Sequence, residues 1–109
     1  MKFKFKINEN TTLNDVKIEL NVIKSANVKE IPLNHLFKII EFIGAKQVTA
    51  TGSSVRFEHY LLKDNPFFHG YFQVHKVHGG GDKDKITMID FKKYIYPVLI
   101  IIIELKEKK

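Results

Sequence analysis

The sequence predicts an α+β fold in which two helices flank a three-stranded antiparallel sheet, with further segments before and after this unit. Two observations lead to this class. Apolar residues recur at intervals of three and four in residues 33–43 and again after residue 87, as on the buried face of a helix. Between them lie three alternating segments bounded by Gly, Ser, Asn or Pro. The length suits a single domain over residues 1–109.

Residues 1–27 precede this unit. Residues 2–7 alternate charged and apolar side chains, which predicts a half-buried strand. Residues 12–23 fit two structures, because apolar residues occur both at helical spacing and at every second position from 16 to 22. We favour a helix there, since Thr12 and Asp15 have the spacing of an N-terminal cap.

The unit itself begins with a helix. Pro32 suits its first turn, and Gly44 is placed to end it. Strands are then predicted over residues 47–51, 54–62 and 71–77. A Gly-Ser turn separates the first two, and a loop with Asn, Pro and Gly separates the last two.

The last helix begins near Thr87, which has the spacing of a capping box with Asp90. Pro97 is expected to kink or stop this helix, because proline lacks the backbone N–H. The β-branched residues that follow predict either a continued helix or a strand that pairs with residues 2–7 or with a second copy. The apolar run at 98–103 is far shorter than the roughly 20 residues that cross a bilayer.

Composition narrows the class of partner. The formal net charge of +6 favours an anionic partner such as nucleic acid, an acidic protein or an anionic membrane, although such a charge also serves solubility alone. There is no cysteine, which excludes disulfides and thiolate metal sites. The N-terminus lacks the continuous apolar core of a signal peptide, so we expect a cytoplasmic protein without a membrane partner.

The second and third strands carry polar residues on one face. If the helices cover Val55, Phe57 and their counterparts on the third strand, the opposite face is open to solvent. Arginine on that face offers a planar fork for phosphate, and histidine transfers protons near neutral pH. A plain solvated strand face is the alternative. The open-face residues are Ser54, Arg56, Glu58, Gln73 and His75.

The run His75-Lys76-Val77-His78 before three glycines has three interpretations. A metal site is disfavoured, because histidines three apart on a strand lie on opposite faces and a third ligand is missing. A glycine run can hold a phosphate, but this one lacks P-loop spacing, so no nucleotide cofactor is predicted. The third interpretation is an RNA-contacting edge. His35 and His59 are explained by ordinary packing or exposure.

These segments together resemble the HicA-type toxins of bacterial toxin–antitoxin systems. The resemblance is carried by the helix at 31–44, the run Thr51-Gly52-Ser53-Ser54-Val55-Arg56-Phe57, the His-Lys-Val-His-Gly-Gly run and the basic helix from Thr87. It covers residues 28–97 as the core, and leaves 1–27 and 98–109 as extensions. It implies a fold like that of double-stranded-RNA-binding domains, cleavage of messenger RNA and a HicB-type antitoxin as partner.

One departure affects the implied activity. The commonest family version has a catalytic His after the Gly-Ser pair, where this chain has Ser54. If cleavage occurs, His75 or His78 would transfer the proton and Arg56 would hold the phosphate, without a metal or cofactor. The predicted catalytic group is thus Ser54, Arg56, His75 and His78. The predicted RNA-binding residues are Ser53, Lys76, Lys83, Lys85, Lys92 and Lys93, with a solvated helix face as the alternative for the lysines.

Two other functions remain open. The first is a non-catalytic module that binds RNA or a protein through the same sheet face. The second is a structural protein that forms a homodimer through the apolar residues 98–105.

Overall fold

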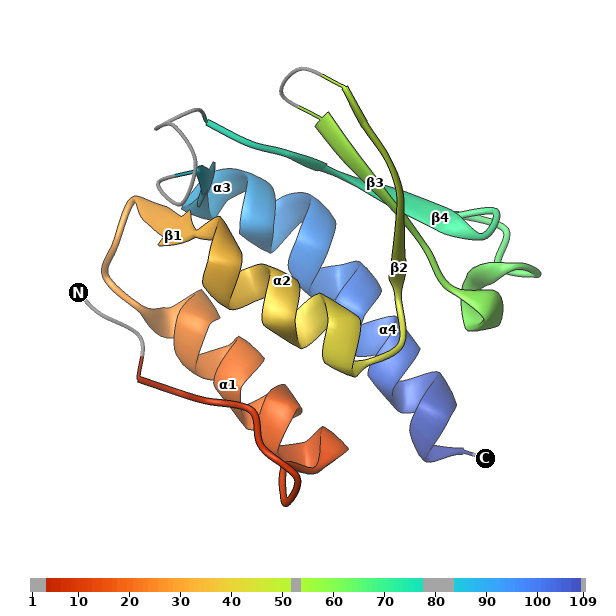
Figure 1. Ribbon diagram of the computed structural model, residues 1–109, viewed down its shortest axis with the longest axis horizontal. Helices are drawn as coiled ribbons and strands as arrows, with labels where there is room; N and C mark the ends of the chain where they lie inside the picture. The colour runs from red at the N-terminus through yellow and green to blue at the C-terminus, as the bar shows by residue number, and fades with distance from the viewer. Residues whose placement is uncertain (1–3, 52–53, 78–83, 109) are drawn as a thin grey trace.

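A computed structural model describes residues 4–51, 54–77 and 84–108. The helices form one layer, and a small antiparallel sheet lies against it (Figure 1). The elements in chain order are α1 (Leu13–Ser25), β1 (Glu30–Pro32), α2 (Leu33–Phe42), β2 (Lys46–Thr51), β3 (Ser54–Glu58), the 3-10 turn η1 (Tyr60–Leu62), β4 (Tyr71–His75), β5 (Lys85–Thr87), α3 (Met88–Asp90), the π-helical turn η3 (Phe91–Ile95) and α4 (Tyr96–Glu107).

The main sheet has the strand order β2-β3-β4, with both pairs antiparallel. Phe57 lies opposite Phe72, and Arg56 opposite Gln73, so that these pairs alternate between the two faces. A second ladder joins β1 to β5 through residues 30–32 and 85–87. The sequence did not predict this ladder, because a three-residue strand is too short for an alternating pattern to be recognised.

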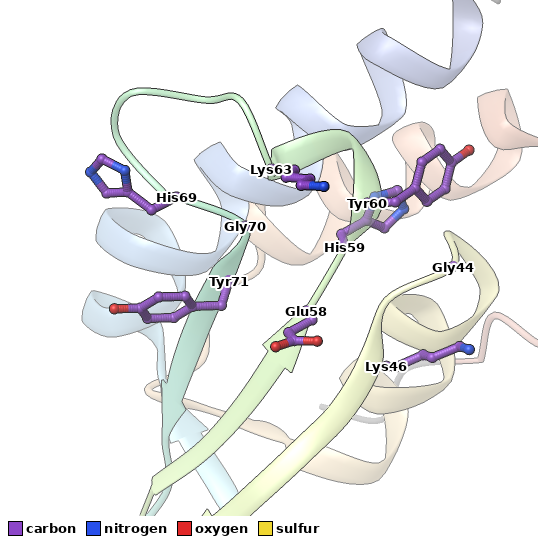
Figure 2. A pocket seen from close by; sticks show the side chains of 9 residues that line it. All are labelled: Gly44, Lys46, Glu58, His59, Tyr60, Lys63, His69, Gly70 and Tyr71. Atoms are coloured by element: carbon purple, nitrogen blue, oxygen red, sulfur yellow. The ribbon is translucent and has the colours of Figure 1, made fainter.

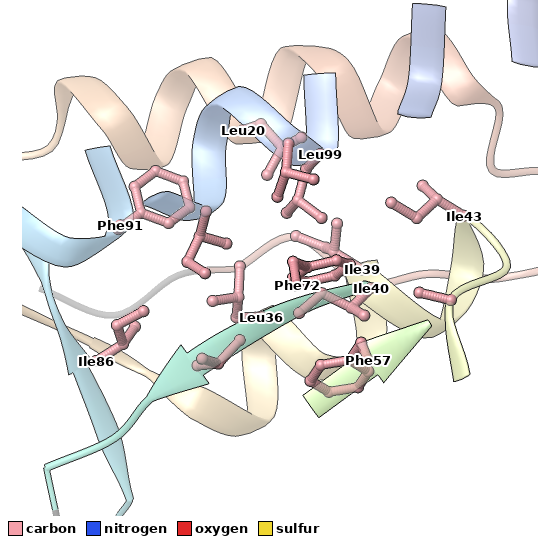
Figure 3. Packing of buried hydrophobic residues seen from close by; sticks show 14 of the residues in the cluster. Leu20, Leu36, Ile39, Ile40, Ile43, Phe57, Phe72, Ile86, Phe91 and Leu99 are labelled. Carbon is pink, nitrogen blue, oxygen red and sulfur yellow. The ribbon is translucent and has the colours of Figure 1, made fainter. Parts of the chain in front are cut away.

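The inner face of the sheet is covered by helices, as predicted. Its four apolar residues on β3 and β4 are at most 5% exposed. The Phe57 ring lies 5.3 Å from Phe37 of α2 and 5.5 Å from Phe72, measured between ring centroids. Figure 3 shows the Phe57 and Phe72 rings in one cluster with apolar side chains of the helices. This packing fixes which face of the sheet remains open.

The N-terminal prediction is half right. α1 is a helix, and Thr12 and Asp15 form a reciprocal capping box, with N–H to oxygen distances of 3.1 and 3.0 Å. The predicted strand at 2–7 is wrong over the described part, since residues 4–7 pair with no strand there. The alternation nevertheless places Phe5 and Ile7 against the core and leaves the lysines exposed. Residues 2 and 3 lie outside the described part.

Two strands end earlier than predicted. β3 stops at Glu58, because the next residue begins the turn η1. β4 stops at His75, and Val77 makes only an isolated bridge with Lys85. Gly44 ends α2 as expected, at a positive φ of 96° that glycine adopts without strain.

Pro97 does not stop the last helix. The chain widens into η3, where the Tyr96 N–H bonds to the Phe91 carbonyl, and Pro97 falls in the first turn of α4. A first-turn proline leaves no hydrogen bond missing. The segment after Pro97 is therefore a helix and not a strand, and it buries four residues in the chain's own core: Val98, Leu99, Ile102 and Ile103.

Within the described residues, no helix combines the length and apolar character that a membrane span requires. Dimerisation through residues 98–105 stays a prediction. Most of the large apolar side chains in this segment are already buried within the monomer, which leaves little apolar surface for a second copy.

Candidate functional site

The open face of the sheet is built by strand alternation. Because Phe57 and Phe72 point into the core, the residues beside them on β3 and β4 point to solvent. This face carries the groups that the sequence predicted, together with an exposed tyrosine that the prediction did not include. Its residues on these two strands are Ser54, Arg56, Glu58, Tyr71, Gln73 and His75.

Arg56 stands at the centre of this face. The 18 Lys and Arg residues of the chain include one arginine, and it is this one. Its guanidinium carbon lies 4.3 Å from the centroid of the Tyr71 ring. Its Nε atom is buried and has no hydrogen-bond partner among the described residues. A buried donor without an acceptor is costly, so the Arg56 fork is a group in need of an acceptor.

Arg56 and His75 share the open face as diagonal neighbours, because Arg56 pairs with Gln73 and His75 lies two residues further along β4. The Arg56 side chain leans the other way, and its guanidinium lies over Tyr71, four residues before His75. His75 is exposed and lies directly opposite Ser54. Of the predicted catalytic residues, Ser54, Arg56 and His75 therefore lie on this face.

Two of the predicted lysines are engaged in ion pairs within the described part of the chain. Lys76 makes an ion pair with Asp84 at 3.1 Å, and Lys85 pairs with Glu30 at 3.8 Å. Lys92 and Lys93 are exposed on η3, and the Lys93 ammonium lies 5.3 Å from the centroid of the Tyr94 ring. Three other predicted residues, Ser53, His78 and Lys83, lie outside the described part.

A pocket of about 490 Å³ opens at the Glu58 end of the sheet (Figure 2). It combines two lysines, two histidines, one carboxylate and two phenols. Lys46 and Glu58 are directly opposite each other on β2 and β3, yet they form no ion pair. Neither side chain has a hydrogen-bond partner within the described residues. The lining residues are Gly44, Lys46, Glu58, His59, Tyr60, Lys63, His69, Gly70 and Tyr71.

No family model, curated protein or solved structure matches this chain. Its function is therefore inferred from its own side chains.

His59 forms the buried wall of the pocket. Its Nε2 lies 2.7 Å from the Ile43 carbonyl oxygen, and its Nδ1 accepts the Leu61 N–H at 3.1 Å. These partners assign the neutral ring with its proton on Nε2. Burial lowers the pKa of His59, the Ile43 carbonyl opposes this, and Lys106 lowers it further. His59 is thus a packing residue, as the sequence predicted, that joins the end of α2 to η1.

His69 is held at the pocket in an unusual backbone conformation. Its φ is 52°, in the left-handed region that L-residues rarely occupy, and its N–H donates to the Asn65 carbonyl at 3.0 Å. The Asn65 side chain fixes the preceding turn by accepting the N–H groups of Phe67 and Phe68 at 2.8 and 3.2 Å. This loop therefore sets the position of His69 through local hydrogen bonds.

The pocket was missed because its residues come from segments that are far apart in sequence. The sequence does contain local signals of turns, because Gly44 and Gly70 mark two chain reversals that line the pocket. Only the pairing of β3 with both neighbours brings these reversals to one end of the sheet. Among the described residues, no three His, Asp or Glu side chains gather as metal ligands would.

Proposed function

We propose that this protein binds RNA on the open face of its sheet, with Arg56 as the residue that holds a backbone phosphate. The observation that carries the proposal is the buried Nε of Arg56, which has no acceptor in the described chain. A phosphate offers two oxygens in the geometry of the guanidinium fork. Once the side chain turns toward the ligand, a phosphate would therefore satisfy a donor that folding leaves buried and without a partner.

Tyr71 supplies the second requirement of an RNA-binding surface. Tyr71 is 41% exposed, and its ring already carries Arg56 over it. Proteins that bind single-stranded RNA stack unpaired bases on such aromatic rings and draw the strand in by positive charge. Gln73 and Ser54 add amide and hydroxyl groups that suit ribose and base edges. The net charge of +6 favours the encounter with a polyanion.

The order of elements supports a finer proposal. α2, the three strands and the final helix follow one another as in the double-stranded-RNA-binding-like fold that the HicA resemblance implies. We extend the proposal to membership of that family, with messenger RNA as the ligand and a HicB-type protein as the partner. α1 and the β1–β5 ladder lie outside that order.

Fluorescence anisotropy with a short single-stranded RNA tests the binding proposal. Arg56→Ala should weaken binding and reduce the slope of log affinity against log salt by about 0.7, the value for one lost phosphate contact on a single strand. Lys38→Ala is the matched control, since Lys38 is an exposed cation on α2 with the same charge. Equal affinity and slope for the two variants would contradict the proposal, as would absence of binding by the wild-type chain.

RNA cleavage is a second candidate, carried by the exposure of His75 opposite Ser54. An accessible imidazole can take the proton of a ribose 2′-hydroxyl, whose oxygen then attacks the adjacent phosphorus. The bond to the 5′-oxygen of the next nucleotide breaks, that oxygen takes a proton from water, and a 2′,3′-cyclic phosphate remains. The wild-type chain and its His75→Gln and His78→Gln variants would be incubated with labelled RNA in EDTA. Loss of cutting in either variant assigns that histidine to the reaction. RNA that stays intact with wild-type protein, or equal cutting by all three, would leave the non-catalytic binding module.

A further inference from the structure

We propose that the pocket beside Tyr71 holds one unpaired guanine of the bound RNA, with the Glu58 carboxylate against its Watson–Crick edge. This inference rests on the proposed RNA binding and names the base that the site selects. The pocket volume of about 490 Å³ lies within the range of about 300–1,000 Å³ that small-molecule sites occupy. The space suits a single nucleotide taken out of its stack.

Glu58 has the chemistry that selects guanine. An ionised carboxylate has two acceptor oxygens and no donor. Guanine presents two adjacent donors, N1–H and the N2 amino group, which match both oxygens. The corresponding edges of adenine, cytosine and uracil each place an acceptor beside a donor, so one carboxylate oxygen would face a lone pair. The edge that Glu58 would read is the one used in base pairing, so the guanine must be unpaired.

The carboxylate is available for this role. Glu58 is exposed, and within the described part of the chain it makes neither a hydrogen bond nor an ion pair, even with Lys46 across the strand. Figure 2 shows it between Tyr71 and Lys46, with which it lines the pocket. An exposed glutamate facing a lysine at this register would ordinarily form a cross-strand pair. Here both side chains are left for a ligand that carries donors and negative charge.

Tyr71 connects the pocket to the phosphate-binding arginine. Arg56 lies over the Tyr71 ring and does not line the pocket, so the pocket reaches Tyr71 from another side of the ring. A phosphate on Arg56 and a base in the pocket would therefore belong to the same or adjoining nucleotides. Lys46 and Lys63 provide cations for the flanking phosphates.

The test compares two short single-stranded RNAs by anisotropy: oligouridylate, and the same oligomer with one central guanine. The wild-type chain should bind the guanine-containing RNA about tenfold more tightly, as expected for a two-bond base contact. Glu58→Gln should lose this preference, because its amide replaces one acceptor with a donor. Glu9→Gln removes the same charge from the turn before α1 and should keep the preference.

The outcomes separate the two proposals. If both RNAs bind equally, or the preference survives in Glu58→Gln, the guanine inference is overturned while RNA binding stands. If neither RNA binds, RNA binding fails, and 5′-GMP and 5′-UMP are titrated into ¹⁵N-labelled protein. Shifts of pocket amides with GMP alone would then support the pocket as a guanine site, and absence of such shifts would overturn it.

Discussion

The two ends of the open sheet face differ in how they are built. At one end, Ser54 and His75 face each other across β3 and β4, and strand alternation alone places them there. At the other end, Glu58 and Tyr71 occupy the equivalent register, but a buried histidine, a hydrogen-bonded loop and the end of α2 surround them with a pocket. Alternation therefore supplies a polar surface, whereas turns and loops convert part of that surface into a site.

Arg56, at the centre of the face, has its side chain at the end that carries the pocket. Arg56 lies midway along β3, yet its guanidinium stacks on Tyr71. The resemblance predicted a catalytic group of Ser54, Arg56, His75 and His78, and it did not include Tyr71 or the pocket. A strand pattern therefore identifies which face is open to solvent, but not which end of that face carries a pocket.

We expect the two ends of the open sheet face to differ most in how much a substitution there weakens RNA binding. Tyr71→Ala should lower the affinity for single-stranded RNA by about five- to a hundredfold, because base–aromatic stacking contributes about 1–3 kcal/mol. His75→Ala should lower it less than about threefold, since an exposed imidazole offers at most a hydrogen bond. Anisotropy titrations of both variants measure this, with thermal unfolding to verify that each is folded. A larger loss in His75→Ala would reverse the comparison.

His59, in the wall of the pocket, should also make the free energy of unfolding depend on pH. Above pH 6.5 His59 is neutral in both the folded and the unfolded chain. As the pH falls below 6.5, the unfolded chain takes up this proton first, because burial lowers the pKa of the folded residue. The free energy of unfolding should therefore fall with pH in this window, and protonation would break the bond from the Leu61 N–H.

The free energy of unfolding is measured with urea between about pH 7.5 and 4.5, a range that spans the ordinary pKa of histidine. His59→Gln retains an amide that can donate to Ile43 and accept from Leu61, but it does not titrate. Its unfolding free energy should fall less steeply with pH than that of the wild type. Identical slopes in the two proteins would show that His59 does not contribute.

The smallest expected effect is backbone strain at His69. His69→Gly should raise the free energy of unfolding by up to about 1 kcal/mol, since glycine adopts a positive φ without the clash of a Cβ. His69→Ala removes the same imidazole but keeps the strained backbone, so it should show no gain. Chemical denaturation compares the two variants. Equal stability of the glycine and alanine variants would argue against strain at this position.

Much of the fold could be predicted from periodicity. The capping box at Thr12 decided correctly for a helix, and alternation on β3 identified the buried face around Phe57. Residues 4–7 show the limit of the same rule, because alternation reports which side chains are buried and not whether a partner strand exists. β3 ended early since the His59 side chain accepts a nearby backbone N–H, which favours a turn.

The remaining differences depend on contacts distant in sequence. Pro97 is accommodated by the π-helical turn before it, a local widening that no residue pattern announces. The pocket depends on the meeting of three reversals of the chain, at Gly44, after Glu58 and at Gly70. Strand alternation placed Arg56 and His75 on the open face of the sheet. It could not predict that the Arg56 guanidinium lies over Tyr71 and not toward His75.

The most direct test of the account is the affinity of Arg56→Lys for single-stranded RNA. Lysine keeps the positive charge but lacks the planar fork and the stacking on Tyr71. We predict that the affinity at fixed salt falls at least about fivefold, while its salt dependence stays that of the wild type. An Arg56→Lys variant that binds RNA as tightly as the wild type would contradict the claim that this guanidinium fork holds the phosphate.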